Sequence, residues 1–278
     1  MLNNAFDGCK IEKYDLPNVL SVTGCSGRSN GLNYQTLQSI NLPNAIELSD
    51  DCFCYCQYLS SANIPKAKNI GYNAFSDSNI SAVELLNAQS IGNHAFDSTK
   101  LSVVDMPLAT TAGAGAFYHC GNVLSANLPK LTAINSELFK CCNKLSSVYA
   151  PKAEYVDSNG FGRCSELTEL TLPNATSFGN YAFTDCAKLS SIDCSEITAV
   201  GYHCFNGCSS LTSLDLRKVS YIGSGAFQNC EKLKSVQFSN MLTGIYYDAF
   251  NWQDYDYDSG NYHYYWHITC PALKEVIF

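Results

Sequence analysis

The chain has 278 residues, of which 46% are hydrophobic and 15% are charged, and its formal net charge is -8. This length fits one or two globular domains or a single array of repeats. The acidic balance argues against nucleic acid as a partner, because a nucleic-acid groove needs a basic face to neutralise phosphates. No run of about 18 or more apolar residues occurs, so the sequence predicts no membrane insertion. The first residues also lack the basic and apolar regions of a signal peptide.

A repeat of nearly constant length runs along the chain. Successive anchor phenylalanines are separated by 22, 21, 21, 22, 22, 22, 22, 22 and 23 residues. They are Phe53, Phe75, Phe96, Phe117, Phe139, Phe161, Phe183, Phe205, Phe227 and Phe250. Phe6 opens an earlier unit, and a degenerate unit of 26 residues separates the Leu-Pro-Asn sequences at Leu16 and Leu42. We therefore expect one repeat domain over residues 1–278, with about 12 units of about 21–26 residues.

Each unit begins with a short alternating segment. In "LTELTLP", Leu170 and Leu172 alternate with polar residues, which is typical of a strand with one buried face. A proline then ends most of these strands, because it cannot donate a hydrogen bond to a sheet. These prolines are Pro43, Pro65, Pro107, Pro129, Pro151 and Pro173. An Ile-Gly step follows as a turn, and an Ala-Phe pair brings a second apolar wedge inward.

One such unit cannot bury its own leucines and phenylalanine, so neighbouring units must stack. No segment has the length and 3.6-residue period of a helix. The sequence therefore predicts a mainly β repeat solenoid. We expect a right-handed coil with a parallel sheet on one face and short turns or one-turn helices on the other.

Eight of the 15 cysteines stand three residues after an anchor phenylalanine. They are Cys9, Cys56, Cys120, Cys142, Cys164, Cys186, Cys208 and Cys230, and Ser78 and Thr99 take this place in two units. One residue per unit becomes one column along the coil, so we expect a buried corner that needs a small side chain able to donate a hydrogen bond. Disulfides between neighbouring units, and a metal site at Cys52, Cys54 and Cys56, are the alternatives.

The repeat resembles the BspA-like class of leucine-rich repeats. The resemblance is carried by "IGNHAF" (91–96), "FTDCAKLSSID" (183–193) and "IGSGAFQNCEKL" (222–233), and the pattern covers essentially the whole chain. It implies a leucine-rich repeat fold without a catalytic centre. It also implies adhesion or recognition of host proteins or other cells, and a cell-surface or secreted setting. Similar repeats look at home in phage proteins, so a phage particle is the alternative setting.

Candidate catalytic residues are sparse. Of the five histidines, His94, His119 and His203 lie in turns next to an anchor phenylalanine and read as solvated turn residues. No Gly-x-Ser-x-Gly, phosphate-loop or His-Glu-x-x-His motif occurs. We therefore predict that the protein is not an enzyme and needs no cofactor.

The last unit contains an insertion, residues 251–269, between Phe250 and Cys270. Insertions in repeat proteins map to loops, often on the binding face, and Tyr and Trp dominate recognition hot spots. The candidate binding residues are Trp252, Tyr255, Tyr257, Tyr262, Tyr264, Tyr265 and Trp266. A β-hairpin that turns at "DSGN" and caps the last repeat is one interpretation, and an aromatic platform for a glycan or protein is another. A calcium loop with Asp254, Asp256 and Asp258 is the third, although Gly260 comes one place late and Tyr265 replaces the required Glu.

The outward positions of the strands form a second candidate surface, which is polar and mildly acidic. Tyr149, Asp193 and Asp215 are its candidate binding residues, and a simple solvated sheet is the competing interpretation. Stacked repeats also need a polar cap at each end, so uncapped ends would favour assembly with other chains. The leading hypothesis is a non-enzymatic module that recognises a protein or glycan on a cell surface. A structural spacer or assembly subunit, with the insertion as a cap, is the alternative.

Overall fold

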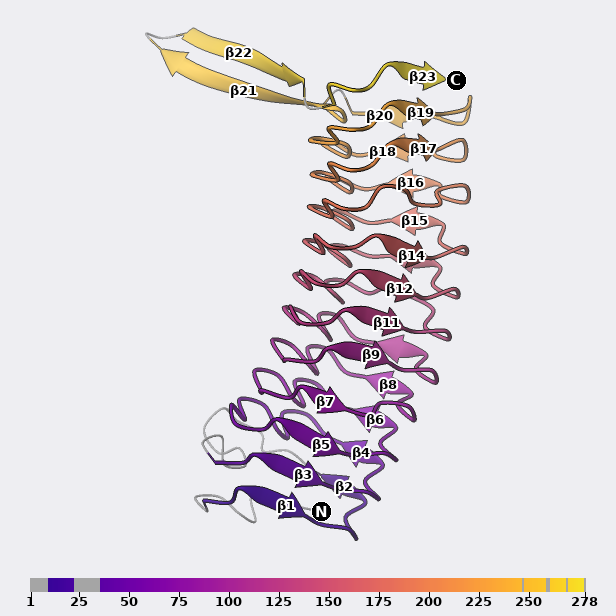
Figure 1. Ribbon diagram of the computed structural model, residues 1–278. Helices are drawn as coiled ribbons and strands as arrows, with labels where there is room; N and C mark the ends of the chain where they lie inside the picture. Colours follow the sequence, from indigo (N-terminus) through magenta and orange to yellow (C-terminus); the bar gives the residue numbers. More distant parts are fainter. Residues whose placement is uncertain (1–9, 23–35, 247, 259–260, 269, 278) are drawn as a thin grey trace.

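The computed structural model describes residues 10–22, 36–246, 248–258, 261–268 and 270–277, and of 251–268 and 275–277 it describes the backbone alone. The chain forms a parallel β-solenoid in which each repeat makes one turn of the coil (Figure 1). The predicted solenoid is thus confirmed.

One row of strands, here the front row, comes from the alternating segment of each repeat. It consists of β1 (Lys13–Asp15), β3 (Ser39–Asn41), β5 (Ser61–Asn63), β7 (Ala82–Val83), β9 (Val103–Asp105), β11 (Ser125–Asn127), β12 (Ser147–Tyr149), β14 (Glu169–Thr171), β17 (Ser213–Asp215), β19 (Ser235–Gln237) and β23 (Glu275–Ile277). These strands pair in parallel, in three successive sheets. The middle residue of a three-residue strand points inward, as Ile40 of β3 and Val104 of β9 do.

A second row of parallel strands, the back row, was not predicted. Its strands contain two residues each: β2 (Ser21–Val22), β4 (Glu47–Leu48), β6 (Asn69–Ile70), β8 (Ser90–Ile91), β10 (Thr111–Ala112), β13 (Tyr155–Val156), β15 (Ser177–Phe178), β16 (Ala199–Val200), β18 (Tyr221–Ile222) and β20 (Gly244–Ile245). The second residue of most of these strands is the apolar residue of the predicted Ile-Gly turn, and it is buried. Part of each expected turn is therefore a strand.

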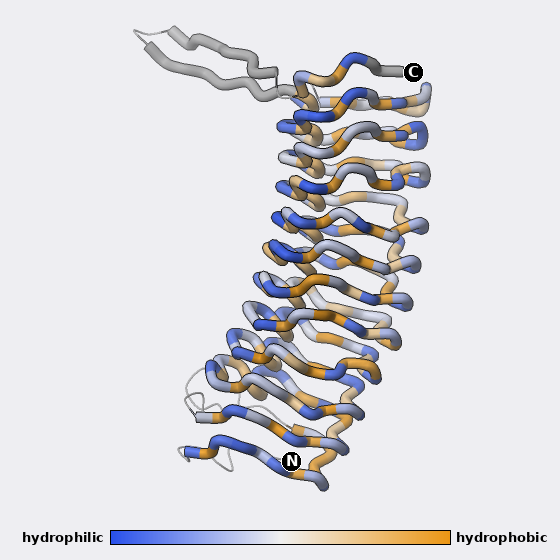
Figure 2. Tube along the Cα trace, viewed as in Figure 1, coloured by the Kyte–Doolittle hydropathy of each residue, from blue (hydrophilic) through white to orange (hydrophobic). Residues whose placement is uncertain are grey.

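The core is a column of stacked rings between the strand rows and the turns. Consecutive anchor phenylalanines from Phe53 to Phe250 lie with ring centroids 5.0–5.8 Å apart. Their planes are within 21° of parallel. Hydrophobic residues recur in every turn of the coil, as Figure 2 shows. Since each ring touches the ring before and after it, every repeat covers the apolar face of its neighbour.

The corner that carries each anchor phenylalanine is built from overlapping turns rather than a helix. Two residues per corner, at two positions before and two after the phenylalanine, have left-handed backbone conformations, such as Asn73 (φ 49) and Asp77 (φ 55) around Phe75. The N–H of Phe75 donates to the carbonyl of Ala95 in the next turn at 2.7 Å. No helix forms in the described ranges, so the expected short turns are present and the alternative of one-turn helices is wrong.

A column of glycines lets consecutive turns approach closely at the end of the back strands. A Cβ atom at Gly92 would lie 2.5 Å from the carbonyl carbon of Gly71 and 2.6 Å from the backbone nitrogen of Tyr72. The same crowding occurs at Gly201 and Gly223. This column therefore needs residues without a side chain, and it leaves exposed backbone between the back row and the corner.

Candidate functional site

The insertion forms a β-hairpin. Strand β21 (Asn251–Asp258) pairs in antiparallel register with β22 (Asn261–Ile268), from Asn251 opposite Ile268 to Asp258 opposite Asn261. The hairpin projects sideways from the coil, and its strands contact each other but no other described strand (Figure 1). The side chains of the candidate binding residues lie outside the described part of the structure. They are those of Trp252, Tyr255, Tyr257, Tyr262, Tyr264, Tyr265 and Trp266.

The calcium candidates occupy alternate positions of β21. Asp254, Asp256 and Asp258 pair through their backbones with Tyr265, His263 and Asn261. This backbone is extended, unlike the tightly curled loop that gathers successive ligands around Ca²⁺. Their carboxylates are not described. Among the side chains that are described, no group of three or more His, Cys, Asp or Glu could hold a metal ion, and this includes the cluster at Cys52, Cys54 and Cys56.

The candidate residues of the front row are separated along the coil. Tyr149 is exposed on β12, with Thr171 as its register partner on the next strand. Asp193 is exposed, and its Oδ1 accepts a hydrogen bond from the backbone N–H of Ser195 at 2.9 Å. The three residues therefore lie on one long face but do not converge on one point.

Asp215 does not act as an open negative charge. The guanidinium of Arg217 donates to both of its carboxylate oxygens, with the Nε–Oδ1 distance at 2.9 Å and the Nη2–Oδ2 distance at 2.6 Å. The side-chain hydrogen bond from Arg217 lowers the pKa of Asp215. This ion pair reduces the acidity that the sequence predicted for the front row.

Amide side chains on the same face also bond to one another. Asn63 Nδ2 donates to Asn41 Oδ1 at 2.6 Å, and Asn41 Nδ2 donates to Asp15 Oδ1 at 2.7 Å. Asn127 donates to Asp105 in the same way at 2.8 Å. These chains of hydrogen bonds tie neighbouring turns together, so part of the polar face serves stability.

The buried thiols beside the anchor phenylalanines each donate a hydrogen bond to a phenylalanine carbonyl of the preceding turn. The sulfur–oxygen distances are 2.9–3.2 Å. The donors are Cys120, Cys142, Cys164, Cys186, Cys208, Cys230 and Cys270, and the acceptors are Phe96, Phe117, Phe139, Phe161, Phe183, Phe205 and Phe227. Thr99 donates to Phe96 at 2.8 Å. Cys270 thus restores the repeat after the hairpin.

Burial makes these thiols poor nucleophiles and poor metal ligands. It raises the pKa of Cys120 to about 11 and that of Cys56 to about 12. A thiolate is the reactive and metal-binding form of cysteine, so both are protonated near neutral pH. The column is a structural feature of the coil.

Sequence reasoning missed a cluster of exposed aromatic side chains near the foot of the hairpin. We name it the tyrosine ledge; its members are Tyr181, Tyr202, His203, Tyr221 and Tyr246. The rings of Tyr181 and Tyr202 lie 5.3 Å apart at 75°, and those of Tyr221 and Tyr246 lie 6.0 Å apart at 88°. The four tyrosines are 36–48% exposed.

Hydrogen bonds and burial shape this ledge. Burial, and then a hydrogen bond with the Tyr202 phenol, raises the pKa of Tyr181. Burial lowers the pKa of His203, although Asp248 opposes this. The Nδ2 amide of Asn206 lies 3.0 Å from Nδ1 of His203, which fits a neutral imidazole that accepts at this atom. The ledge is therefore uncharged near neutral pH.

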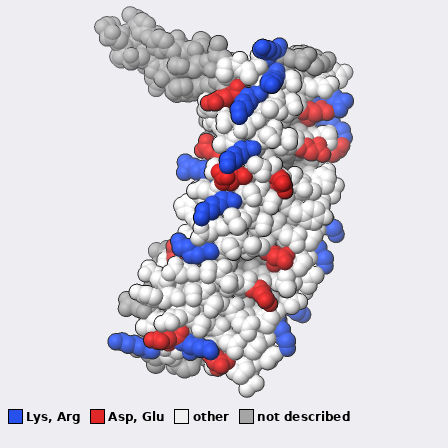
Figure 3. Space-filling model, in the orientation of Figure 1, with Lys and Arg blue, Asp and Glu red and all other residues white. Residues whose placement is uncertain are grey.

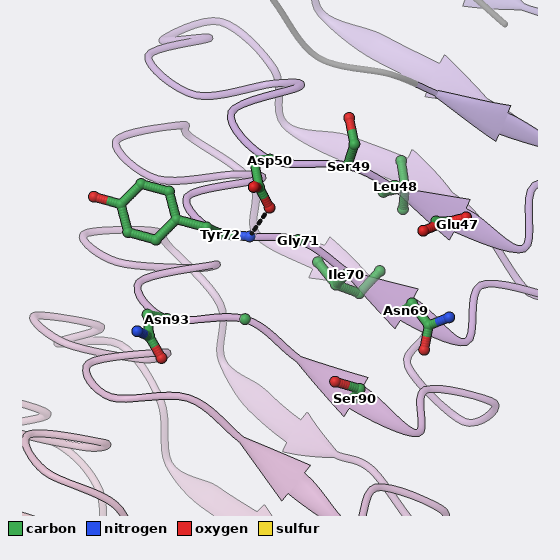
Figure 4. A pocket seen from close by; sticks show the side chains of 11 residues that line it. Glu47, Leu48, Ser49, Asp50, Asn69, Ile70, Gly71, Tyr72, Ser90 and Asn93 are labelled. Atoms are coloured by element: carbon green, nitrogen blue, oxygen red, sulfur yellow. Dashed lines mark hydrogen bonds between the residues drawn. The ribbon is translucent and has the colours of Figure 1, made fainter. Parts of the chain in front are cut away.

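A pocket of about 270 Å³ lies within the ledge. Its lining residues are Asn180, Gly201, Tyr202, Tyr221, Gly223, Ser224 and Tyr246. A second pocket, of about 530 Å³, occupies the equivalent place in the N-terminal half, where Asp50, Gly71, Tyr72, Gly92 and Asn93 correspond to Asn180, Gly201, Tyr202, Gly223 and Ser224 (Figure 4). A carboxylate caps the backbone of Tyr72 there, with Asp50 Oδ1 at 2.7 Å from its nitrogen. Asn180 does the same for Tyr202 at 2.9 Å.

The remaining surface mixes both signs of charge. Figure 3 shows Lys and Arg interspersed with Asp and Glu along the coil, with wide uncharged areas between them. Pairs such as Lys188–Glu166 and Lys218–Glu196 connect neighbouring turns at 2.6 Å. Within the part of the chain that the structure describes, no helix is long and apolar enough to cross a bilayer.

Comparison with solved structures supports the fold. A leucine-rich repeat protein from Bacteroides ovatus matches with a TM-score of 0.52 and 20% identity, over 92% of this chain and 86% of that one. A leucine-rich cell surface protein from Faecalibacterium prausnitzii matches with a TM-score of 0.42 and 20% identity, over 96% and 88%. The pneumococcal vaccine antigen PcpA matches with a TM-score of 0.45 and 16% identity, over 96% and 73%. No curated protein matches the chain.

The sequence also matches a family model directly. The model describes a BspA-type leucine-rich repeat region of six copies, and it matches residues 28–146 and 132–255. These ranges span most of the coil, including the phenylalanine column, the glycine column and the buried thiols. The chain therefore belongs to the BspA-type leucine-rich repeat family.

Proposed function

We propose that this protein is a non-enzymatic recognition module that binds a protein or glycan on a cell surface through its hairpin and the polar front row. Leucine-rich repeat proteins of this family serve as interaction or adhesion scaffolds. The observation that carries the proposal is the hairpin, which projects from the coil and does not lie on another strand (Figure 1). An insertion that served only as a cap would have to lie against the last turn.

The composition and register of the hairpin support this role. Tyr255 pairs with Tyr264, Tyr257 with Tyr262, and Gln253 with Trp266. Opposite residues in an antiparallel pair share one face of the ribbon, so this register favours a face rich in aromatic residues. Tyr and Trp provide large contact areas at a small entropic cost, and they are the most frequent anchors in recognition surfaces.

A shortened hairpin tests the proposal. Residues 253–266 are replaced by Asn-Gly, so that Trp252 and His267, which are register partners, close a two-residue turn. The change keeps the strand parity of the present turn, which Asp258 and Asn261 close, and it removes six of the seven candidate aromatic residues. The probes are immobilised mucin, an extracellular-matrix protein mixture and cultured epithelial cells.

We expect the wild-type protein to bind at least one of these surfaces and the shortened form to lose most of that binding at an unchanged melting temperature. Unchanged binding would remove the hairpin from the recognition surface. A large fall in melting temperature would show instead that the hairpin is a structural cap. The substitution Tyr149→Ala, on an exposed front-row position, then measures the share of the strand face.

A further inference from the structure

We propose that the pocket of the tyrosine ledge is a second binding site, which takes an uncharged sugar unit of a glycan. This inference deepens the proposed function and rests on it for its biological setting, but the site itself is separate from the hairpin. It is formed by described side chains of the coil, in the three turns before the hairpin begins.

The chemistry of the lining favours a neutral saccharide. Among the described residues that line the pocket, three are tyrosines, two are glycines, and the others are Asn180 and Ser224. None of these is charged or aliphatic. A sugar ring alternates C–H groups, which pack on aromatic faces, with hydroxyl groups, which need hydrogen-bond partners. A peptide anchor would instead favour an apolar pocket, and an anionic ligand would need a cation.

The backbone register leaves one aromatic ring open for such packing. Tyr221 stands in the back row between two small register partners, Ala199 on β16 and Gly244 on β20. A Cβ atom at Gly244 would lie 3.3 Å from Cδ2 of Tyr221. Because Gly244 has no side chain, the Tyr221 ring is not covered from that turn and is 45% exposed.

The floor of the pocket brings a ligand close to the backbone. A Cβ atom at Gly223 would lie 2.6 Å from the backbone nitrogen of Tyr202, so any side chain there would disturb the wall beside the pocket. On the rim, the hydroxyl of Ser224 lies 2.6 Å from Oδ2 of Asp248 and donates to it. Its oxygen is thereby oriented as an acceptor for a ligand hydroxyl.

The N-terminal pocket provides an internal comparison. It has the same glycine floor, and Tyr72 stands where Tyr202 stands in the ledge (Figure 4). Ser90 replaces Tyr221, however, and Glu47 and Asp50 add carboxylates to the lining. The equivalent place thus lacks the aromatic walls, and we expect it not to bind the same sugar.

The matched substitutions Tyr202→Ala and Tyr72→Ala test the site. Both remove a tyrosine that follows a column glycine and is 40–45% exposed, so their effects on folding should be alike. Tyr221→Ala removes the open ring, and Tyr221→Phe keeps the ring without its hydroxyl. The probe is a printed array of neutral gluco-, manno-, galacto- and xylo-oligosaccharides with sialylated and sulfated counterparts. Titration of the best soluble oligosaccharide follows.

We expect neutral oligosaccharides to bind the wild-type protein and the Tyr72→Ala variant equally. Tyr202→Ala and Tyr221→Ala should weaken binding about tenfold or more, and Tyr221→Phe should weaken it less. The shortened hairpin should keep this binding even if it loses its macromolecular partner, which separates the two proposals. The inference is overturned by an array without neutral ligands, by binding confined to charged glycans, or by equal losses in the Tyr72 and Tyr202 variants.

Discussion

The thiol of Cys164 donates a hydrogen bond to the carbonyl oxygen of Phe139, one turn earlier, at 3.0 Å. The same oxygen accepts the backbone N–H of Cys142, also at 3.0 Å. The buried carbonyl thus has one partner from its own turn and one from the next. This relationship explains why a small side chain able to donate recurs three residues after the anchor phenylalanine.

Replacing Cys164 by Ala should destabilise the protein by about 1–2 kcal/mol, because it removes this hydrogen bond and leaves a small cavity. Cys164→Ser should cost less, since Thr99 already bonds its own buried carbonyl through a hydroxyl. Urea unfolding of the two variants measures the difference. A serine variant that is less stable than the alanine variant would contradict the proposed role of the donor.

Substitution of Gly92 by Ala should destabilise the coil by about 2 kcal/mol or more, because the added methyl group would clash with the backbone of the preceding turn. Gly121→Ala is the matched control, since its Cβ would meet nothing within 4 Å. That change should alter stability by about 0.5 kcal/mol or less. Thermal unfolding of both variants checks the prediction, and equal effects would refute the close-approach explanation.

Alkylation of the native protein with iodoacetamide should distinguish Cys141 from the buried thiols. Cys141 is half-buried at a corner, whereas Cys142 and Cys164 are fully buried and burial raises their pKa well above the ordinary value. Peptide mass spectrometry should therefore find Cys141 modified before either neighbour, with all three modified in denaturant. Rapid native labelling of Cys164 would show that the coil opens readily.

Acidification should weaken the coil through His203. Burial lowers the pKa of this imidazole in the folded state, so the unfolded chain binds the additional proton first. The histidine therefore contributes stability above its unfolded pKa of about 6.5, and this contribution falls as the pH drops through the folded value. Stability measured at several pH values should fall less on acidification in a His203→Asn variant, because Asn tolerates the left-handed backbone there (φ 49).

A parallel slope for the two proteins would show that His203 does not carry this effect. Asp248, which opposes the shift, remains in both, so the comparison isolates the imidazole. The remaining histidines are also common to the wild-type protein and the variant.

The sequence allowed prediction of the solenoid and its core because the phenylalanine spacing recurs in nearly every unit. It did not predict the back row, since strands of two residues, such as Asn69–Ile70, are too short to show a period. The helical alternative for the corners failed for a related reason. Most left-handed positions carry residues other than glycine, such as Glu137 and Arg163, so the usual signature of this backbone is absent.

The tyrosine ledge was hidden for a different reason. Tyr202 and Tyr221 lie in positions that differ from unit to unit, and only stacking of consecutive turns brings them to one pocket. The front-row candidates were placed on the correct face, but their hydrogen-bond partners could not be read from the pattern. The pairing of Asp215 with Arg217 is such a case.

The paired left-handed positions at each corner also bear on how such a chain changes over evolutionary time. The position two residues before the phenylalanine carries Asp51, Asn73, His94, Gly115, Glu137, Asn159, Tyr181, His203 and Gly225 in successive turns. The backbone keeps its conformation although acid, amide, aromatic and glycine residues alternate there. A single mutation at this rim can therefore change what the surface presents without altering the scaffold. New specificities are then accessible in small steps, and an inserted ribbon is a larger step along the same route.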